Sequence, residues 1–253
     1  MAIEIFCRKE QKYLISKEQY NRLIEEMGNR MRSDKNGDNG KYTVTSLYFE
    51  NEAKQIYFET KNKLQYRQKL RLRVYGDTDL AGTAFFEVKQ KHKDVVNKRR
   101  AVIPLAEAYR YLKEGSKGGL DHFHVSNRQV LKEIDYFINY YGLQPEMIVS
   151  YDRHALHGVD DEDLRITFDF NLRCRNQDLH LEHGTYGDPF IDLNLVVLEV
   201  KVDHSVPLWL VRILQSLDCE QRSASKFCTS TELLDGELFP LETEFENTTI
   251  GGN

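Results

Sequence analysis

The chain has 253 residues, of which 40% are hydrophobic and 11% aromatic, so it can bury a substantial core as one large domain or two. A formal net charge of −5 argues against a protein that coats nucleic acid electrostatically, and no nucleic-acid partner is expected. The positive charge is nevertheless local: residues 61–100 hold twelve lysines and arginines against four acids, which suits a compact anionic ligand.

The four cysteines are scattered and form no Cys-x-x-Cys pair, which argues against a disulfide framework or a structural zinc site. The first residues carry charges where a signal peptide needs an apolar run, and no stretch reaches the apolar length of a membrane helix. We therefore expect a soluble cytoplasmic protein with reduced thiols and no transmembrane segment.

Alternation of apolar and polar residues predicts about eight β-strands. Their ranges are 4–15, 42–50, 64–75, 82–92, 95–103, 146–155, 163–170 and 194–203. Helical signals lie at 18–28, 104–115, 127–142 and 206–217. Ser16 and Gln19 form a capping-box pattern before the first helix, and Ser126 and Gln129 form another before the third. Strands with charged and apolar faces, joined through helices, indicate a closed antiparallel sheet with helices on its apolar side.

The polar faces of these strands are unusually rich in cations. The segment "KLRLRVYG" at 69–76 has a cation at every second position, and carboxylates occur singly on the other faces. For one strand, the solvated face of a sheet is the simpler interpretation. Cations two residues apart lie about 7 Å from each other, which costs about 2.4 kcal/mol per pair at an effective dielectric near 20. A tunnel lined in this way is best explained as built around a polyanion.

Eight segments in order resemble the VTC domain, the catalytic domain of the vacuolar transporter chaperone complex, within the triphosphate tunnel metalloenzyme (CYTH-like) superfamily. They are "RKEQKYLI", "TSLYFEN", "KLRLRVYG", "FFEVKQKH" followed by "KRR", "SYDRHAL", "LRITFD", "LEVK" and "SASKF", from about Phe6 to Phe227. The resemblance implies an α+β, mainly β fold: a closed eight-stranded antiparallel β tunnel with helices packed on the outside. It implies one tunnel domain at 1–236, and we expect the acidic tail at 237–253 to be mobile.

The same resemblance implies a polyphosphate polymerase that transfers the γ-phosphoryl group of ATP to a growing chain and uses Mn²⁺ or Mg²⁺. Seven basic residues match the family's phosphate-binding positions and are predicted to be catalytic: Lys12, Arg71, Arg73, Lys89, Lys98, Arg165 and Lys226. The resemblance places the metal on Glu199, to which Glu87 or Glu10 could add a carboxylate. Further substrate contacts are expected from Arg8, Lys69, Lys91, Arg100, Arg153, Lys201 and Tyr48.

Some of these assignments have simpler alternatives. Glu10 or Glu87 could serve only as the ion-pair partner of a neighbouring lysine. Tyr48 and Tyr151 are expected to be wall or core aromatics rather than catalytic groups. No family position supports Lys69.

Two other functions remain open on the same tunnel: hydrolysis of inorganic or nucleoside triphosphates, and non-catalytic binding of polyphosphate or nucleotide. The related triphosphatases begin with Glu-x-Glu-x-Lys, whereas Arg8 makes the pattern Arg-x-Glu-x-Lys here, which weakens the hydrolase hypothesis without excluding it. The eukaryotic polymerase also carries an SPX domain and a transmembrane part. The sequence shows neither, so we expect a stand-alone form, whose oligomeric state is not predicted.

Overall fold

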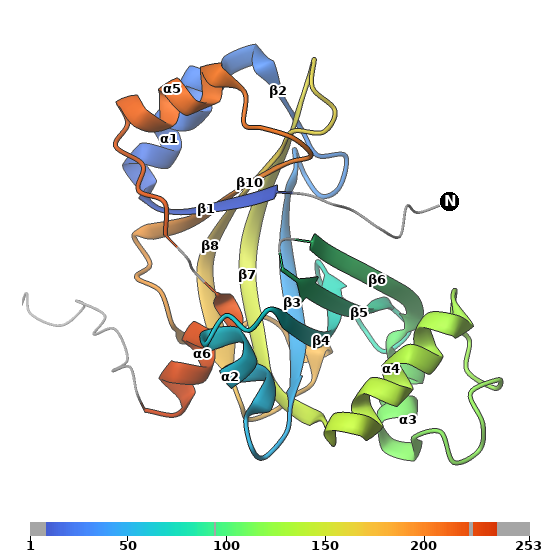
Figure 1. Cartoon of the computed structure of the whole chain (residues 1–253). Coiled ribbons are helices and arrows are strands. Elements are labelled where there is room, and N and C mark those ends of the chain that lie inside the picture. The colour runs from blue at the N-terminus through green and yellow to red at the C-terminus, as the bar shows by residue number, and fades with distance from the viewer. Residues whose placement is uncertain (1–8, 94, 223–224, 237–253) are drawn as a thin grey trace, which may run out of the picture.

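The computed structural model in Figure 1 describes residues 9–93, 95–222 and 225–236. Arg8 and the acidic tail predicted at 237–253 therefore lie outside the described residues.

One antiparallel sheet forms the centre of the molecule (Figure 1). Its strands are β1 (Lys9–Ser16), β2 (Met31–Ser33), β3 (Lys41–Glu50), β4 (Tyr66–Tyr75), β5 (Thr83–His92), β6 (Val95–Pro104), β7 (Gln144–Gly158), β8 (Arg165–Arg175), β9 (Asp188–Pro189) and β10 (Leu195–Val202). Eight of them follow one hydrogen-bonded path, β1-β10-β8-β7-β3-β4-β5-β6, while β2 pairs with β7 and β9 pairs with β8. These eight are the predicted strands, and the predicted fold class is confirmed.

Six α-helices surround this sheet within the described residues. They are α1 (Lys17–Met27), α2 (Gln55–Lys61), α3 (Leu105–Glu114), α4 (Arg128–Tyr141), α5 (Leu208–Ser216) and α6 (Lys226–Leu234). The four predicted helices are present, whereas α2 and α6 were not predicted. The 3₁₀ turns are η1 (Gly28–Arg30) and η2 (Leu181–His183).

The helix caps show where local sequence patterns succeed and fail. The capping box of Ser16 and Gln19 at α1 is confirmed. The predicted cap Ser126 of α4 is wrong by one residue, because the Asn127 side chain accepts the hydrogen bond from the N–H of Val130, at 3.1 Å. Ser126 Oγ instead accepts from the N–H of Val102 on β6, at 2.8 Å.

The helices pack on the sheet in three pairs, of which α2 and α6 lie together, with α2 against β4. In Figure 1, α3 and α4 lie against β5 and β6, and α1 and α5 lie together at the other end, where α1 packs on β1 and β10. On β4, Leu70 and Leu72 are fully buried in this outer core. Since neighbouring strand residues point to opposite faces, the charged residues between them point inward.

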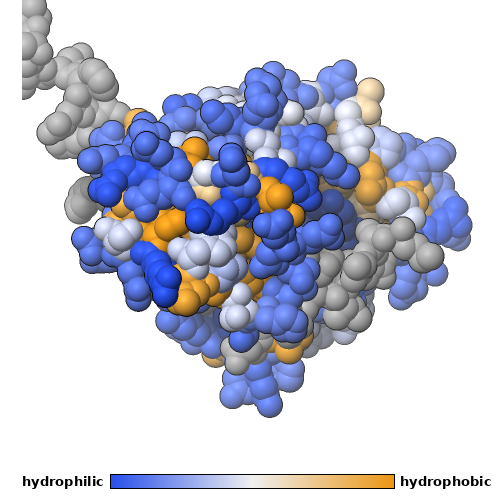
Figure 2. Space-filling view, turned by 90° about the horizontal axis from the view of Figure 1, so that it is seen from above, coloured by the Kyte–Doolittle hydropathy of each residue, from blue (hydrophilic) through white to orange (hydrophobic). Residues whose placement is uncertain are grey.

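The outer surface differs from this core. The face in Figure 2 is mainly hydrophilic, with apolar residues interspersed. None of the helices in the described part of the chain is long and apolar enough to cross a membrane.

Candidate functional site

Glu87 on β5 is the centre of a first group of inward-pointing charges, the Glu87 cluster. Strand register places it between Arg71 on β4 and Arg100 on β6. Arg71 Nε lies 2.7 Å from its Oε2, Arg100 Nε lies 2.9 Å from its Oε1, and Lys98 Nζ also pairs with Oε1. Arg73 Nη1 completes the cluster at 4.0 Å. Burial alone would raise the pKa of Glu87, but these cations hold it well below its ordinary value.

The two arginines of β4 are also held by neutral groups. Arg73 Nε donates to Ser46 Oγ at 2.9 Å, and its Nη2 donates to the hydroxyl of Tyr151 at 3.2 Å. Arg71 Nη1 donates to the hydroxyl of Tyr48 at 3.4 Å. Burial raises the pKa of Tyr48, but Arg71 and Arg73 outweigh it and lower this pKa to about 8. Both guanidinium groups are therefore fixed in orientation on the inner face.

Glu199 on β10 is the centre of a second group, the Glu199 cluster. Lysine Nζ atoms lie around its carboxylate at 2.7 Å for Lys201, 3.1 Å for Lys226 and 3.4 Å for Lys12. Arg153 Nη2 lies 3.8 Å away. Glu199 is 6% exposed, and burial would raise its pKa, yet the surrounding cations keep it well below its ordinary value.

Asp169 on β8 belongs to the same cluster and was not predicted as a site residue. It is fully buried, and Arg153 binds it with two hydrogen bonds, from Nε at 2.7 Å and from Nη2 at 2.8 Å. Lys226 Nζ lies 2.6 Å from its Oδ2. Its position two residues after Thr167 and four after Arg165, on the polar face of one strand, was the sequence signal that could have identified it.

Two side chains, Glu10 and Tyr151, make contacts across the interior. Glu10 on β1 lies 3.4 Å from Lys12 and 3.4 Å from Lys89 on β5, which links the first strand of the path to a strand near its other end. The hydroxyl of Tyr151 contacts Arg73, and Lys226 Nζ lies 5.0 Å from the centre of its ring. Tyr151 is thus a wall residue, as expected, that contacts cations of both clusters.

Helix α6 brings two further contacts to the interior. Lys226 is its first residue, and Ser225 is its N-cap. Lys69 Nζ donates to Ser225 Oγ at 3.2 Å and lies 4.7 Å from the ring centre of Phe227. Burial lowers the pKa of Lys69 to about 8. The start of α6 is therefore part of the tunnel wall.

Three predicted residues are not part of this network. Arg165 Nη2 pairs with Asp34 at 3.0 Å and donates to Tyr42 at 3.3 Å, so it lies on the wall outside both clusters. Lys91 has no ion pair within the described residues, and Arg8 lies outside them.

The predicted metal carboxylates can be tested against the geometry. Glu87 belongs to its own cluster, whereas Glu10 and Glu199 each lie 3.4 Å from the same Lys12 Nζ. Thr167 lies opposite Glu199 in strand register, and its buried Oγ1 has no hydrogen-bond partner among the described residues. Ionised carboxylates beside an unsatisfied hydroxyl form an oxygen donor set that suits Mg²⁺ or Mn²⁺ together with phosphate oxygens. The residues around Glu199 fit such a metal better than Glu87 does.

Together, the fold and the inward-facing residues define the class of protein: an antiparallel β tunnel whose inner face is lined mainly with cations. The family model of the VTC domain matches residues 7–235, and the chain belongs to this family.

Two known proteins are similar to this chain. Vacuolar transporter chaperone complex subunit 4 of Schizosaccharomyces pombe is 26% identical over 152 residues, which are 53% of this chain and 21% of that protein. The chain thus spans about a fifth of the length of this relative. The solved structure of HpAC1 from Hippeastrum, described as revealing a dominant triphosphatase activity, aligns over 92% of this chain and 98% of that chain. Its TM-score is 0.52 at 19% identity, which supports the tunnel fold.

Proposed function

We propose that this protein is a metal-dependent polyphosphate polymerase that transfers the γ-phosphoryl group of ATP to a growing polyphosphate chain inside the tunnel. The observation that carries the proposal is the charge imbalance on the inner face. Ten cations, Lys12, Lys69, Arg71, Arg73, Lys89, Lys98, Arg100, Arg153, Lys201 and Lys226, are arranged around four carboxylates, Glu10, Glu87, Asp169 and Glu199. A bound polyanion would offset this excess.

Phosphoryl transfer needs positioned charge more than covalent catalysis, because negative charge is spread over several phosphate oxygens in the transition state. Arg71 and Arg73 are oriented by their contacts with Tyr48 and Ser46, and a triphosphate would compete with Glu87 for both guanidinium groups. Lys226 and Lys12 belong to the Glu199 cluster, where both contact the Glu199 carboxylate. In this proposal, the two arginines bind the triphosphate. The two lysines neutralise negative charge on the phosphate that reacts.

The ionisation of the carboxylates favours a phosphate acceptor over water. Burial and the neighbouring Glu199 raise the pKa of Glu10, but Lys89, Lys12 and Lys201 outweigh them and hold this pKa at about 2. A general base works best when its pKa is near the working pH. A carboxylate with so low a pKa is a poor base for activating water, whereas the terminal phosphate of a chain is already an anion and needs no base.

A divalent metal is part of the proposed site. Glu199 would hold it, with Glu10 and Thr167 nearby, and Mn²⁺ or Mg²⁺ bound there would neutralise and orient phosphate oxygens. The lysines around Glu199 would also contact the phosphates and keep them in register with the arginines of β4.

A triphosphatase is the second candidate, favoured by the fold shared with HpAC1, whose structure is described as revealing that activity. Incubation of the purified protein with γ-labelled ATP and Mn²⁺ separates the possibilities. Long labelled chains support the polymerase, labelled phosphate alone supports the triphosphatase, and unchanged ATP despite tight binding indicates a binding module.

Arg71→Gln tests whether the tunnel is the nucleotide site. A hydrogen bond to a charged group contributes about 1.5–3 kcal/mol, so we expect ATP binding to weaken about ten- to a hundredfold in calorimetric titration. Arg22→Gln on the outer helix α1, where the side chain is 57% exposed, is the matched control and should bind normally. Normal ATP binding by the Arg71 variant would refute the tunnel site.

We also propose that the protein works in the cytoplasm. Cys174, Cys219 and Cys228 are free cysteines in the structure, which fits a reducing compartment, while Cys7 lies outside the described residues. Cell fractionation followed by immunoblotting would test this location.

A further inference from the structure

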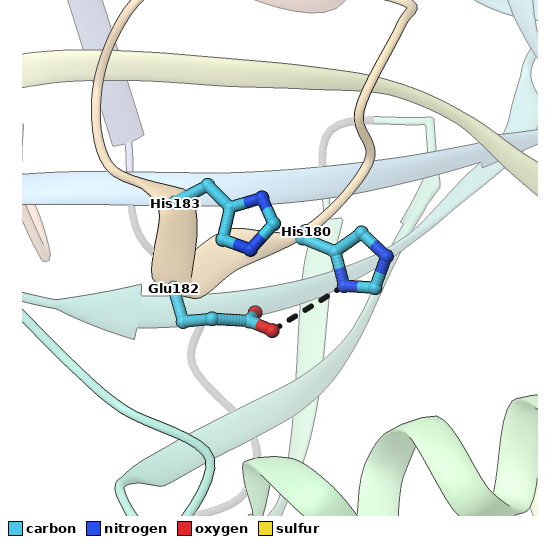
Figure 3. Close-up of side chains that lie close together, drawn as sticks. All are labelled: His180, Glu182 and His183. Atoms are coloured by element: carbon cyan, nitrogen blue, oxygen red, sulfur yellow. Dashed lines mark hydrogen bonds and ion pairs between the residues drawn. The ribbon is translucent and has the colours of Figure 1, made fainter.

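The loop that follows β8 carries two histidines and a carboxylate that converge outside the tunnel clusters. Figure 3 shows His180, Glu182 and His183 around the turn η2, with both imidazole rings beside the carboxylate. Their candidate ligand atoms all lie within 4.8 Å of one another. Within the part of the chain that the structure describes, no other three histidine, cysteine, aspartate or glutamate side chains bring candidate ligand atoms so close together.

The 3₁₀ turn explains why the two histidines meet. Residues three apart in a 3₁₀-helix lie one above the other, unlike residues in an α-helix. His180 is the N-cap of η2 and His183 is its last residue, so their rings stack at a centroid distance of 5.0 Å and an angle of 29°. His180 Nδ1 also lies 3.3 Å from Glu182 Oε1.

A buried arginine holds the loop in this shape. Arg175, the last residue of β8, is 5% exposed and donates four hydrogen bonds to loop carbonyl oxygens. These bonds reach the carbonyls of Asp178 at 2.9 Å, His180 at 2.8 Å, Gly184 at 2.9 Å and Tyr186 at 2.9 Å. The backbone under the three side chains is thus fixed before any ligand arrives.

Neighbouring side chains orient two of the three groups. The Asp178 carboxylate contacts His183 Nδ1 at 2.8 Å, which leaves the Nε2 of His183 as the nitrogen available to a ligand. Tyr109 on α3 donates its hydroxyl hydrogen to Glu182 Oε2 at 2.7 Å, and the N–H of Leu181 donates to the Tyr109 oxygen at 2.7 Å. Carboxylate contacts to the second ring nitrogen of a histidine are a general feature of metal sites.

We propose that His180, Glu182 and His183 form a binding site for a divalent transition metal ion of the Zn²⁺ class. Two imidazoles and one carboxylate are a donor set that favours Zn²⁺ over Mg²⁺ or Ca²⁺, which prefer oxygen ligands alone. Three protein ligands leave a fourth position for water. The site is separate from the tunnel, so it is independent of the proposed function.

Other histidines near carboxylates do not reproduce this arrangement and supply a control. His124 Nδ1 lies 3.9 Å from Glu107 and His122 Nε2 lies 4.0 Å from Glu114, so each faces a different carboxylate. A variant carrying His122→Gln and His124→Gln removes as many imidazoles as one carrying His180→Gln and His183→Gln. Comparing the metal affinities of these two variants distinguishes a specific site at His180, Glu182 and His183 from the general affinity of exposed histidines for metal ions.

The test is a calorimetric titration of the whole, tag-free chain with Zn²⁺ at fixed pH. The unmodified chain with Mg²⁺ in excess serves as the common background, so that the tunnel carboxylates are already occupied. We expect one Zn²⁺ ion to bind per chain, and the His180/His183 variant to lose affinity at least tenfold while the His122/His124 variant keeps it. Equal affinity in both variants, or no stoichiometric Zn²⁺ binding by the background protein, would overturn the proposal.

Asp178→Asn provides a second test that keeps all three ligands. Changing an outer partner of a metal ligand costs about 10- to 100-fold in metal affinity, and we expect a loss in that range.

Co²⁺ gives an independent readout, because its visible absorption should show imidazole ligands in the background protein and lose intensity in the His180/His183 variant. Without metal, the background protein and the His180/His183 variant should have the same thermal melting curve by circular dichroism, since both histidines are exposed. If the folded variant gives an unchanged Co²⁺ spectrum, the proposed site is contradicted.

Discussion

At the scale of single residues, Glu87 has two opposing effects on the tunnel. It is 1% exposed and neutralises part of the charge of four cations, so the tunnel tolerates them without a ligand. The same carboxylate competes with phosphate oxygens for those cations. Removing one partner of a buried ion pair usually costs about 3–5 kcal/mol, because the remaining charge loses its partner.

We therefore predict that Glu87→Gln lowers the free energy of unfolding by about 3–5 kcal/mol and that triphosphate restores much of this loss. Thermal melts with and without triphosphate would measure both effects. Triphosphate should raise the melting temperature of the variant more than that of the unmodified protein. A variant that melts like the parent protein would show that Glu87 does not stabilise the empty tunnel.

Lys69 should make nucleotide binding depend on pH. Burial lowers the pKa of Lys69 to about 8, so the side chain is charged below this pH and neutral above it. We predict that ATP affinity falls as pH rises from 7 to 9. The terminal phosphate of ATP is doubly ionised above about pH 6, so its charge stays nearly constant over this range and does not cause the fall. Titrations at constant ionic strength would measure it.

Two substitutions assign this pH dependence. Arginine stays charged throughout the range, so Lys69→Arg should flatten the curve. Tyr48, whose pKa is also about 8, adds a negative charge on ionisation and would weaken binding in the same direction, an effect that Tyr48→Phe removes. Burial also lowers the pKa of Lys98 to about 7, so some fall should remain in the double variant. If the double variant loses as much affinity between pH 7 and 9 as the parent protein, neither Lys69 nor Tyr48 is responsible.

At the scale of secondary-structure elements, β4 and α6 contribute to the tunnel in different ways. Strand β4 serves two environments through alternation alone, with leucines in the outer core and arginines inside, and sequence analysis could therefore predict both faces. Helix α6 has no such periodic pattern over its nine residues, and most of its side chains, including Lys226, are buried. Its role depends on where its first turn is placed.

The N-cap of α6 is the place to test this role. Ser225 Oγ accepts a hydrogen bond from the N–H of Cys228, at 3.3 Å. It also accepts a hydrogen bond from Lys69 Nζ, at 3.2 Å. We predict that Ser225→Ala costs about 1 kcal/mol of stability and weakens triphosphate binding, because Lys226 and Lys69 lose their fixed positions. Chemical denaturation and calorimetry would measure the two effects.

Asn127→Ala is the matched control for this helix cap. It removes the side-chain cap of α4, which packs on the outside of β5 and β6, and should cost similar stability with no loss of triphosphate affinity. Equal effects of both variants on binding would mean that the α6 cap acts only through overall stability.

At the scale of the whole molecule, the charge distribution sets the binding behaviour. The chain carries a net charge of −5, while its inner face carries an excess of cations. We predict that triphosphate affinity falls steadily between 50 and 500 mM NaCl, since salt screens the attraction of partly exposed charges such as Lys89 and Lys98. Isothermal titration across this series would test it, and a salt-independent affinity would place the ligand away from the cationic tunnel.

Ligand binding should also stabilise the whole fold. Triphosphate at a hundred times its dissociation constant should add about 2.7 kcal/mol to the free energy of unfolding, because it binds only the folded chain. This gain should be absent for a matched inorganic anion such as sulfate at the same ionic strength.

Much of this arrangement was predictable from local patterns. The eight main strands, the inward face of β4 and the capping box of α1 follow from alternation and from short-range hydrogen bonding. The short strands β2 and β9 and the helices α2 and α6 were missed, because two or three extended residues or a helix without periodicity leave little local signal. The alternation of Arg165, Thr167 and Asp169 placed Asp169 on the inward face, but its partners Arg153 and Lys226 come from other elements and could not be read from this pattern.

The sequence by itself determined which residues face inward, because side-chain alternation along a strand is a property of the backbone. Only the tertiary structure decided which inward residues meet. Lys12, Arg153 and Lys226 converge on Glu199 from β1, β7 and α6, and Arg165 turns instead to Asp34. Such partners are chosen by strand order and by the curl of the sheet, which depend on packing between residues far apart in the chain. The same distinction applies to His180 and His183, whose spacing is visible in the sequence but whose meeting depends on the 3₁₀ turn that Arg175 holds.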